Sequence, residues 1–149
     1  MKLPYHRATT GRMAQGEMQS MLRRVGASSF GVMEEYDAGE LIVQFEWRSR
    51  RVTLKASVKG YAAAWLREHP YTKAMRCTRA EHEARAMRQA NLSVWSILRD
   101  WLKGQVTAIE IGMIDFDAAF LAQIVLPDGG TVLERVKHTG QLPQLEGPK

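Results

Sequence analysis

Residues 40–59, ELIVQFEWRSRRVTLKASVK, decide the fold because apolar and polar side chains alternate along them. In a strand, successive side chains point to opposite faces, so this alternation is typical of a strand with one buried face. After a tight connection at Ser49 and Arg50, the alternation resumes and continues through Val58. The stretch therefore predicts two antiparallel strands joined by a short turn. The first strand buries Leu41, Val43, Phe45 and Trp47.

The segment before this pair predicts a short helix and one more strand. Apolar side chains over 13–25 recur at spacings of three and four, which stack on one helical face. Gly26 follows, where a helix often closes in a left-handed conformation. A strand is expected around Phe30 and Val32, before turn-forming residues at 37–39. Together with 40–59, this gives a three-stranded antiparallel meander.

A long helix is predicted after Thr78. Thr78 and Glu81 have the spacing of a capping box, and apolar positions keep a helical period until Gly112. About 33 residues at roughly 1.5 Å each span about 50 Å, more than the width of such a domain. We therefore expect the first three turns to project into solvent or onto a partner. The preceding residues 60–77 are interpreted as a connection.

The C-terminal part predicts a short helix and a closing hairpin. Asp115 is suited to cap a helix over 116–123. Residues 124–126 and 131–136 flank a Pro-Asp-Gly-Gly turn and are expected to pair as a β-hairpin. Residues 138–149 are expected to form a flexible tail.

These elements predict an α+β fold in which residues 1–137 form a single domain. A chain of 149 residues is long enough to bury roughly 70% of its unfolded surface. No apolar run approaches the roughly 20 residues that span a bilayer, and the N-terminus lacks the apolar core of a signal peptide. We therefore expect a cytoplasmic protein with no membrane partner. The lone Cys77 agrees, because one thiol cannot form an internal disulfide.

Four parts of the chain carry a resemblance to a known family. They are Gly26–Phe30, Ser49–Val52, Trp95–Gly112 and Phe120–Val132, the last reading FLAQIVLPDGGTV. In this order they resemble a family of small uncharacterised proteins encoded by tailed phages and prophages, in which glycine stands in place of Ser49. The match departs from the family pattern at 60–71. The resemblance implies the cytoplasm of a host cell as the location, and it supplies no active site.

Charge is distributed unevenly along the chain. Residues 1–79 hold fourteen Lys and Arg against seven Asp and Glu, whereas residues 80–149 hold seven against nine. A basic segment of this kind is typical of a protein that binds a polyanion. The charge therefore favours a binding protein over an enzyme.

Two groups of basic residues predict where phosphate would bind, since the arginine fork matches phosphate oxygens. A solvated hairpin explains the first group equally well, and both interpretations stay open. We expect a non-enzymatic accessory protein of DNA replication, recombination or regulation. DNA is expected rather than RNA, because the second predicted helix, which starts after Thr78, lacks the lysine-rich start of a double-stranded RNA binder. The predicted contacts are Arg48, Arg50, Arg51, Lys55 and Lys59 in the first group, and Lys73, Arg76, Arg79, Arg85 and Arg88 in the second.

Aromatic residues support an alternative hypothesis, a protein-binding module such as an inhibitor of a host enzyme or an assembly factor. Such a module would present Trp65, Trp95 and Trp101. The long helix also has more apolar surface than three short strands can cover, which predicts a homo-oligomer through it. Trp65 could instead stack on bases with Tyr61 and Tyr71, but packing on the sheet is the favoured explanation.

Chemistry-bearing residues are sparse. Asp115 and Asp117, with Glu110, are the candidates for holding Mg²⁺. A helix cap and a first-turn acid explain the two aspartates more simply. The four histidines lack the spacing of a metal site, and Cys77 has no catalytic partner in the sequence. We therefore expect no metal, no cofactor and no enzymatic activity.

Overall fold

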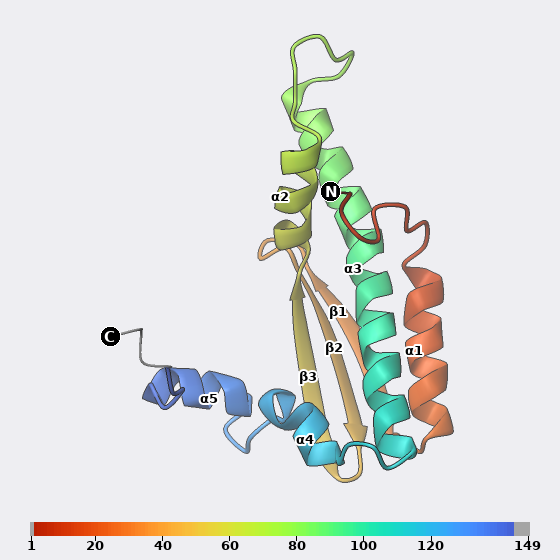
Figure 1. Cartoon of the computed structure of the whole chain (residues 1–149), viewed down its shortest axis with the longest axis vertical. Coiled ribbons are helices and arrows are strands. Elements are labelled where there is room, and N and C mark those ends of the chain that lie inside the picture. Colours follow the sequence, from red (N-terminus) through yellow and green to blue (C-terminus); the bar gives the residue numbers. More distant parts are fainter. Residues whose placement is uncertain (1, 145–149) are drawn as a thin grey trace.

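The computed structural model describes residues 2–144 and has an α+β fold (Figure 1). A short helix is followed by three antiparallel strands, a long helix and a short helix, as the sequence predicts. The elements are α1 Arg12–Arg24, β1 Ser29–Glu35, β2 Glu40–Trp47, β3 Arg50–Ser57, α2 Val58–Glu68, α3 Arg79–Glu110, α4 Phe116–Phe120, the 3-10 turn η1 Leu121–Gln123, and α5 Val132–Thr139.

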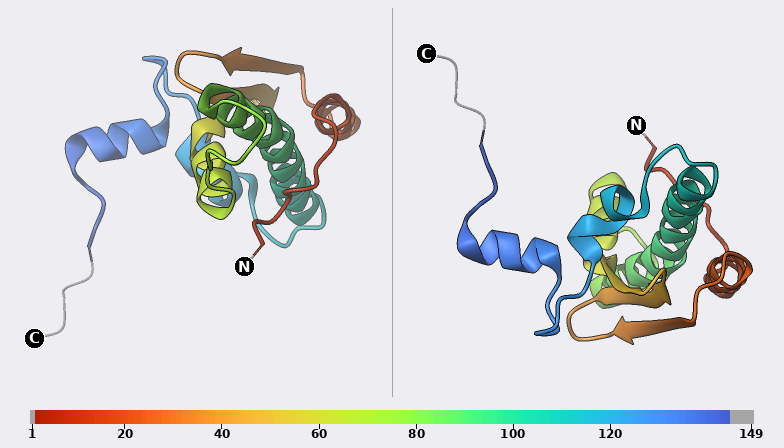
Figure 2. Two further views of the ribbon diagram at one scale, coloured as in Figure 1. Left: turned by 90° about the horizontal axis from the view of Figure 1, so that it is seen from above. Right: turned by 90° about the horizontal axis from the view of Figure 1, so that it is seen from below.

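The sheet has the order β1-β2-β3, with β2 in the centre. Phe45 on β2 lies opposite Phe30 on one side and Val52 on the other. Phe45 and Val43 are fully buried, because α3 covers this face of the sheet and α1 lies beside α3 (Figure 2). The predicted burial of alternate residues along β2 is confirmed.

The turn between β2 and β3 has an unusual backbone. Arg48 and Ser49 both have positive φ, 53° and 62°. Two left-handed residues match the twist of the strands that they join, but this conformation is strained for residues other than glycine. The Arg48 guanidinium lies 5.0 Å from the centre of the Trp47 ring, which holds the turn against β2.

Residues 60–77 are not simply a connection, and this prediction is wrong for the first part of the segment. The strand alternation ends at Ser57, whose Oγ accepts a hydrogen bond from the Gly60 N–H at 2.9 Å and caps α2. Apolar side chains at Val58, Ala62 and Trp65 follow at helical spacing and are buried. Val58 fits both patterns, so the strand alternation hides where the helix begins.

Helix α3 begins and ends as predicted. Both hydrogen bonds of the capping box between Thr78 and Glu81 are present, and Gly112 has a φ of 76° just beyond the last turn. Its first turns do not stand alone, because α2 packs along them. His82 and Ala86 are buried there. A pair of helices therefore extends beyond the sheet, where the sequence predicts a single exposed helix (Figure 1).

The C-terminal part closes one end of the core. Phe116 and Phe120, on the helix capped by Asp115, pack edge-on against Trp47 and Phe45. The predicted closing hairpin is reduced to a single bridge between Val125 and Thr131 around the Pro-Asp-Gly-Gly turn, and a second bridge joins Ile124 to Val52 of β3.

Residues 132–139 form α5 instead of a strand. The hydroxyl of Thr131 accepts a hydrogen bond from the Glu134 N–H, and the carboxylate of Glu134 accepts one from the Thr131 N–H. Helix α5 thus includes the first two residues of the predicted tail, and residues 145–149 of that tail lie outside the described residues.

The N-terminal segment crosses α3 and is held by specific hydrogen bonds. The Tyr5 hydroxyl donates to Asp100 Oδ2 at 2.6 Å, and the Ser93 hydroxyl donates to the Tyr5 carbonyl at 2.8 Å. Hydrogen bonds from the Tyr5 hydroxyl and from Arg99 lower the pKa of the Asp100 carboxyl. The same bond to Asp100 raises the pKa of Tyr5.

Substituting Asn for Asp100 is expected to lower the free energy of unfolding by about 1 kcal/mol near neutral pH, since the site is exposed to water. The folded-state pKa of Asp100 is lowered, so its stabilisation is complete above the ordinary carboxyl pKa of about 4 and is lost as pH falls through the folded value. Urea unfolding at about pH 7 and about pH 3 should therefore show the difference between wild type and Asp100→Asn shrinking in acid.

Asp37→Asn is the control, because its carboxylate has no ion pair or hydrogen bond within residues 2–144. It should change the free energy of unfolding little at either pH. If Asp100→Asn lowered the free energy of unfolding by the same amount at both pH values, the role given to the Asp100 carboxylate would be contradicted.

Candidate nucleic-acid interface

The ten predicted phosphate contacts divide into two groups with different surroundings. Four residues on the β2–β3 hairpin, here called the hairpin cations, each have an acidic partner. The pairs are Arg48 with Glu110 at 3.4 Å, Arg50 with Asp117 at 3.5 Å, Arg51 with Glu46 at 2.8 Å, and Lys55 with Glu134 at 3.4 Å.

Three of these pairs join the hairpin to the C-terminal half of the chain. Glu110 ends α3, Asp117 lies in α4 and Glu134 lies in α5. Each pair is about half exposed, so it contributes at most about 1 kcal/mol. The pairs nevertheless neutralise the hairpin locally. The basic and acidic parts of the sequence thus meet in space at the hairpin.

Lys59, the fifth residue predicted with this group, has a structural position. Its Nζ donates to the Asp37 carbonyl at 2.8 Å. Its side chain crosses Gly39, where an added Cβ would clash with Lys59 Cγ and where φ is 64°. Lys59 therefore fastens the β1–β2 turn to the start of α2.

The second group lies on the helix pair that extends beyond the sheet. This arm consists of α2, the loop 69–78 and the first three turns of α3 (Figure 1). Six exposed residues, here called the arm cations, form no ion pair with any other residue of the described chain. They are Arg67, Lys73, Arg76, Arg79, Arg85 and Arg88.

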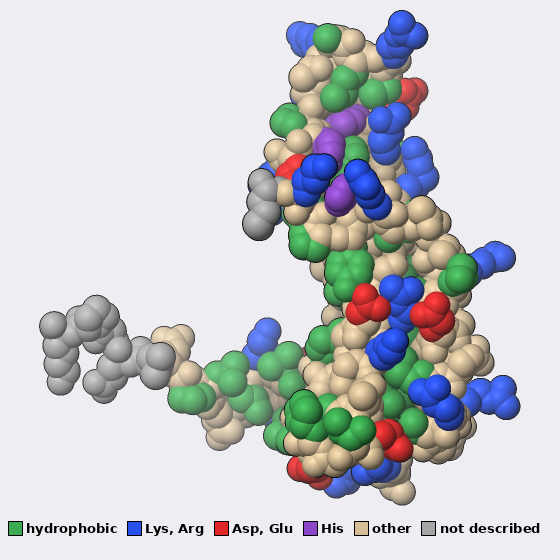
Figure 3. All heavy atoms as spheres, turned by 45° about the vertical axis from the view of Figure 1, so that its right-hand side comes forward, with side chains coloured by type: hydrophobic (Ala, Val, Ile, Leu, Met, Phe, Trp, Pro, Cys, Tyr) green, Lys and Arg blue, Asp and Glu red, His purple; other side chains and the backbone are tan. Residues whose placement is uncertain are grey.

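Positive charge dominates the arm surface. Figure 3 shows Lys and Arg side chains grouped over the upper end of the molecule. The acids of this region are largely occupied, since Glu68 accepts a hydrogen bond from the Leu3 N–H and Glu81 belongs to the capping box. The N-terminal end of α3, with its partial positive charge, also lies at the arm tip. The arm is therefore an electropositive surface with few competing internal anions.

Aromatic and histidine side chains fix the shape of the arm tip. The Trp65 and His69 rings stack with 4.3 Å between their centres. The Arg79 guanidinium lies 5.0 Å from the centre of the Tyr71 ring. His82 is buried with Nε2 2.6 Å from the His69 carbonyl oxygen. The Tyr71 hydroxyl donates to a backbone carbonyl of the same loop at 3.0 Å. These contacts order the loop that carries the tip cations.

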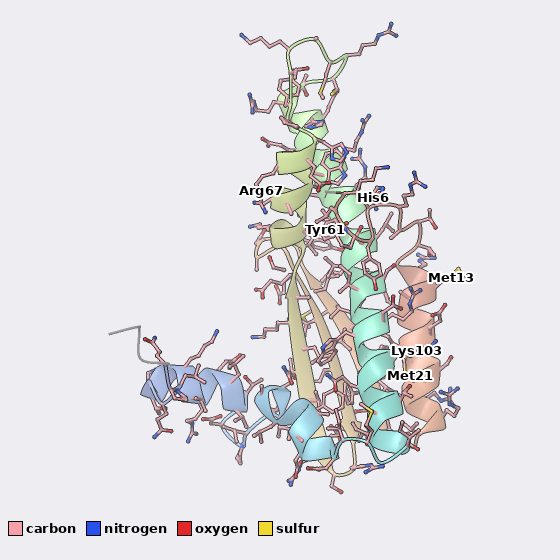
Figure 4. The ribbon with its side chains drawn as sticks, in the orientation of Figure 1. His6, Met13, Met21, Tyr61, Arg67 and Lys103 are labelled. Atoms are coloured by element: carbon pink, nitrogen blue, oxygen red, sulfur yellow. The ribbon has the colours of Figure 1, made fainter. Side chains whose placement is uncertain are left out.

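Arg67 was missed by sequence reasoning. It lies in the last turn of α2 and points outward from the arm (Figure 4). Residues 60–77 are predicted as a connection, so Arg67 has no expected position on a helix face. The available signal was the helical spacing of Val58, Ala62 and Trp65.

The three tryptophans predicted at a protein interface differ in exposure. Trp95 is fully buried and Trp65 is 8% exposed, so both belong to the packed interior of the domain. Trp101 is 37% exposed and lines a groove of about 430 Å³ between β3, α3 and the start of α5. Most apolar side chains of α3 are covered by its own chain, which leaves Trp101 as the largest exposed apolar group on that helix.

The candidate metal ligands have other roles. Asp115 Oδ1 accepts a hydrogen bond from the Asp117 N–H at 3.0 Å as the cap of α4. Asp117 pairs with Arg50, and Glu110 pairs with Arg48. Among residues 2–144, no three His, Cys, Asp or Glu side chains are grouped so that they could hold a metal ion.

Comparison of the chain with known protein families, curated proteins and solved structures finds no match. The resemblance to a phage-encoded family therefore stays a prediction. No helix in the described part of the chain is both long and apolar enough to cross a membrane.

Proposed function

We propose that this chain is a nucleic-acid-binding accessory protein that holds the phosphate backbone with its arm. One observation carries the proposal: the six arm cations are exposed and have no acidic partner in the described residues. Arginine and lysine that are free of internal partners can neutralise phosphate without first breaking an ion pair.

The hairpin cations are secondary contacts in this proposal. Each would have to exchange a carboxylate for a phosphate, which is feasible because the pairs are exposed and individually weak. Contacts of this kind read no base sequence, so binding should depend little on sequence. The same proposal includes DNA as the nucleic acid that is bound. It also includes a role in phage replication, recombination or regulation, and a host-cell location.

A salt series tests the proposal. Fluorescence anisotropy should show binding to labelled single- or double-stranded DNA that weakens steeply with salt, with log K falling by about 0.7–0.9 per phosphate contact for each unit of log salt. Unlabelled DNA of unrelated sequence should compete equally well. Matching RNA oligonucleotides in the same series measure the preference for DNA. Absence of binding at low salt, or binding that is indifferent to salt, would overturn the proposal.

The groove beside Trp101 favours the alternative, a protein-binding module. Its lining includes Ile97, Leu98 and Leu133 and has few charged groups. Exposed tryptophan in an apolar groove is typical of protein interfaces. The anisotropy assay distinguishes the two proposed functions, because a protein-binding module does not have to bind nucleic acid at low salt.

A further inference from the structure

Strand β1 has an open edge. It pairs with β2 along its whole length, and no strand in the described part of the chain pairs with its other side. Figure 2 shows β1 at the outer margin of the molecule in both views. The opposite edge of the sheet is partly covered, since β3 forms a bridge to Ile124 through Val52.

The open edge lacks the usual protection against pairing. Natural edge strands carry lysine, proline, a bulge or an inward-facing charge that opposes pairing with another chain. Strand β1, SFGVMEE, has neither lysine nor proline, its register with β2 is continuous from Ser29 to Glu35, and its exposed charge, Glu35, is its last residue. The inward-facing Glu34 is already engaged, because its Oε1 accepts hydrogen bonds from Asn91 at 3.0 Å and from Trp95 at 3.4 Å.

Apolar side chains are also exposed along this edge. Val32 is 39% exposed and Met33 is 56% exposed, and Tyr36 just beyond the strand is 84% exposed. A regular, unprotected edge with apolar side chains favours pairing with another strand. Large apolar groups gain by burial at such a contact.

We propose that β1 pairs with β1 of a second copy of this chain about a two-fold axis through Val32. Val32 is the middle residue of the strand, so this axis gives the longest overlap. Glu35 then lies opposite Ser29 of the other copy, and Glu34 lies opposite Phe30. No like charges face each other, so the strand is complementary to itself.

Pairing of this kind joins two three-stranded sheets into one sheet of six strands. The axis is perpendicular to the sheet, so the helices of both copies lie on the same face and the two arms point in opposite directions. A dimer would thus carry two separate arms. Pairing through β1 does not depend on what the arms bind.

Charge placed on the axis tests the pairing. Sedimentation equilibrium should show the wild type as a dimer and the Val32→Lys and Val32→Glu variants as monomers, because like charges would lie directly opposite each other. Equal amounts of the two variants should form a mixed dimer, with Lys opposite Glu. Val32→Thr, which stays neutral and β-branched, is the control and should remain dimeric. A monomeric wild type, dimeric single variants or a mixture that stays monomeric would each overturn the proposal.

A cross-link provides a second test that does not rely on charged variants. With Cys77 replaced by Ser, a Val32→Cys substitution places two thiols opposite each other, within the range of Cα separations that a disulfide spans. Mild oxidation should give a covalent dimer. The exposed Ala84→Cys on α3, in the same Cys77→Ser background, should not cross-link. Equal cross-linking of both, or none at position 32, would overturn the pairing. Loss of nucleic-acid binding would leave both tests unaffected.

Discussion

Replacing Lys73, Arg76 and Arg79 by Ala is expected to weaken binding to duplex DNA by about 10- to 100-fold near physiological salt. These three residues are exposed at the arm tip and have no acidic partner among the described residues. Each lost phosphate contact should lower the slope of log K against log salt by about 1, so the triple variant should lose about 3. Anisotropy titrations at several salt concentrations measure both quantities.

The matched control removes the same charge elsewhere. Arg23 and Arg24 end α1, and Lys103 lies on the lower part of α3 (Figure 4). All three are exposed and far from the arm tip. Their triple replacement by Ala should reduce affinity much less than the arm variant does. Equal losses would show that affinity follows net charge, which would contradict the assignment of the interface to the arm.

Replacing Trp95 by Ala is expected to lower the free energy of unfolding by about 4 kcal/mol. Trp95 is fully buried, and a Cβ added at Gly11 would lie only 2.8 Å from its ring. Its Nε1 donates to Glu34 Oε1 at 3.4 Å, which ties α3 to β1. Truncation removes the largest fully buried side chain and leaves a cavity between three elements. Urea unfolding followed by circular dichroism measures the change.

Trp101→Ala is the comparison for this variant. Trp101 is 37% exposed and packs edge-on against Phe120, with 5.9 Å between the ring centres. Its removal should cost about 2 kcal/mol or less, because solvent already reaches the ring. If the two variants were equally destabilised, the assignment of Trp95 to the core and of Trp101 to the surface would be wrong.

Features set by residues close together in the sequence could be predicted. The alternation over 40–59 defines β2 and most of β3, and the pair Thr78 and Glu81 defines the start of α3. Both signals act within a few residues, through side-chain direction and capping hydrogen bonds. Gly26 and Gly112 follow the same rule, since each adopts positive φ immediately after a helix.

Features that depend on competition between two local patterns were predicted wrongly. Val125 and Thr131 do form a bridge around the Pro-Asp-Gly-Gly turn, but the capping box of Thr131 and Glu134 starts a helix one residue later. In the same way, the alternation of β3 continues into Val58, which already belongs to α2. A single sequence shows both patterns and does not show which one is more stable.

The candidate interface was only partly predictable, because neutralisation depends on distant residues. Arg48 pairs with Glu110, 62 positions away, and Lys55 pairs with Glu134, 79 positions away. Nothing in the local sequence distinguishes these paired cations from the arm cations. The uneven charge of the chain indicates which basic residues are candidates, and only the fold separates those with acidic partners from those without.

The two left-handed residues at the β2–β3 turn also affect how the chain tolerates mutation. Arg48 and Ser49 hold a backbone conformation that costs about 1 kcal/mol or more for each residue that is not glycine. Glycine at position 49 would adopt this conformation without the strain, because it has no Cβ. A lineage with glycine there would gain a margin of stability, and that margin would allow one further mildly destabilising substitution elsewhere to persist. The conformation of this turn would then influence how many destabilising substitutions the rest of the sequence can accumulate.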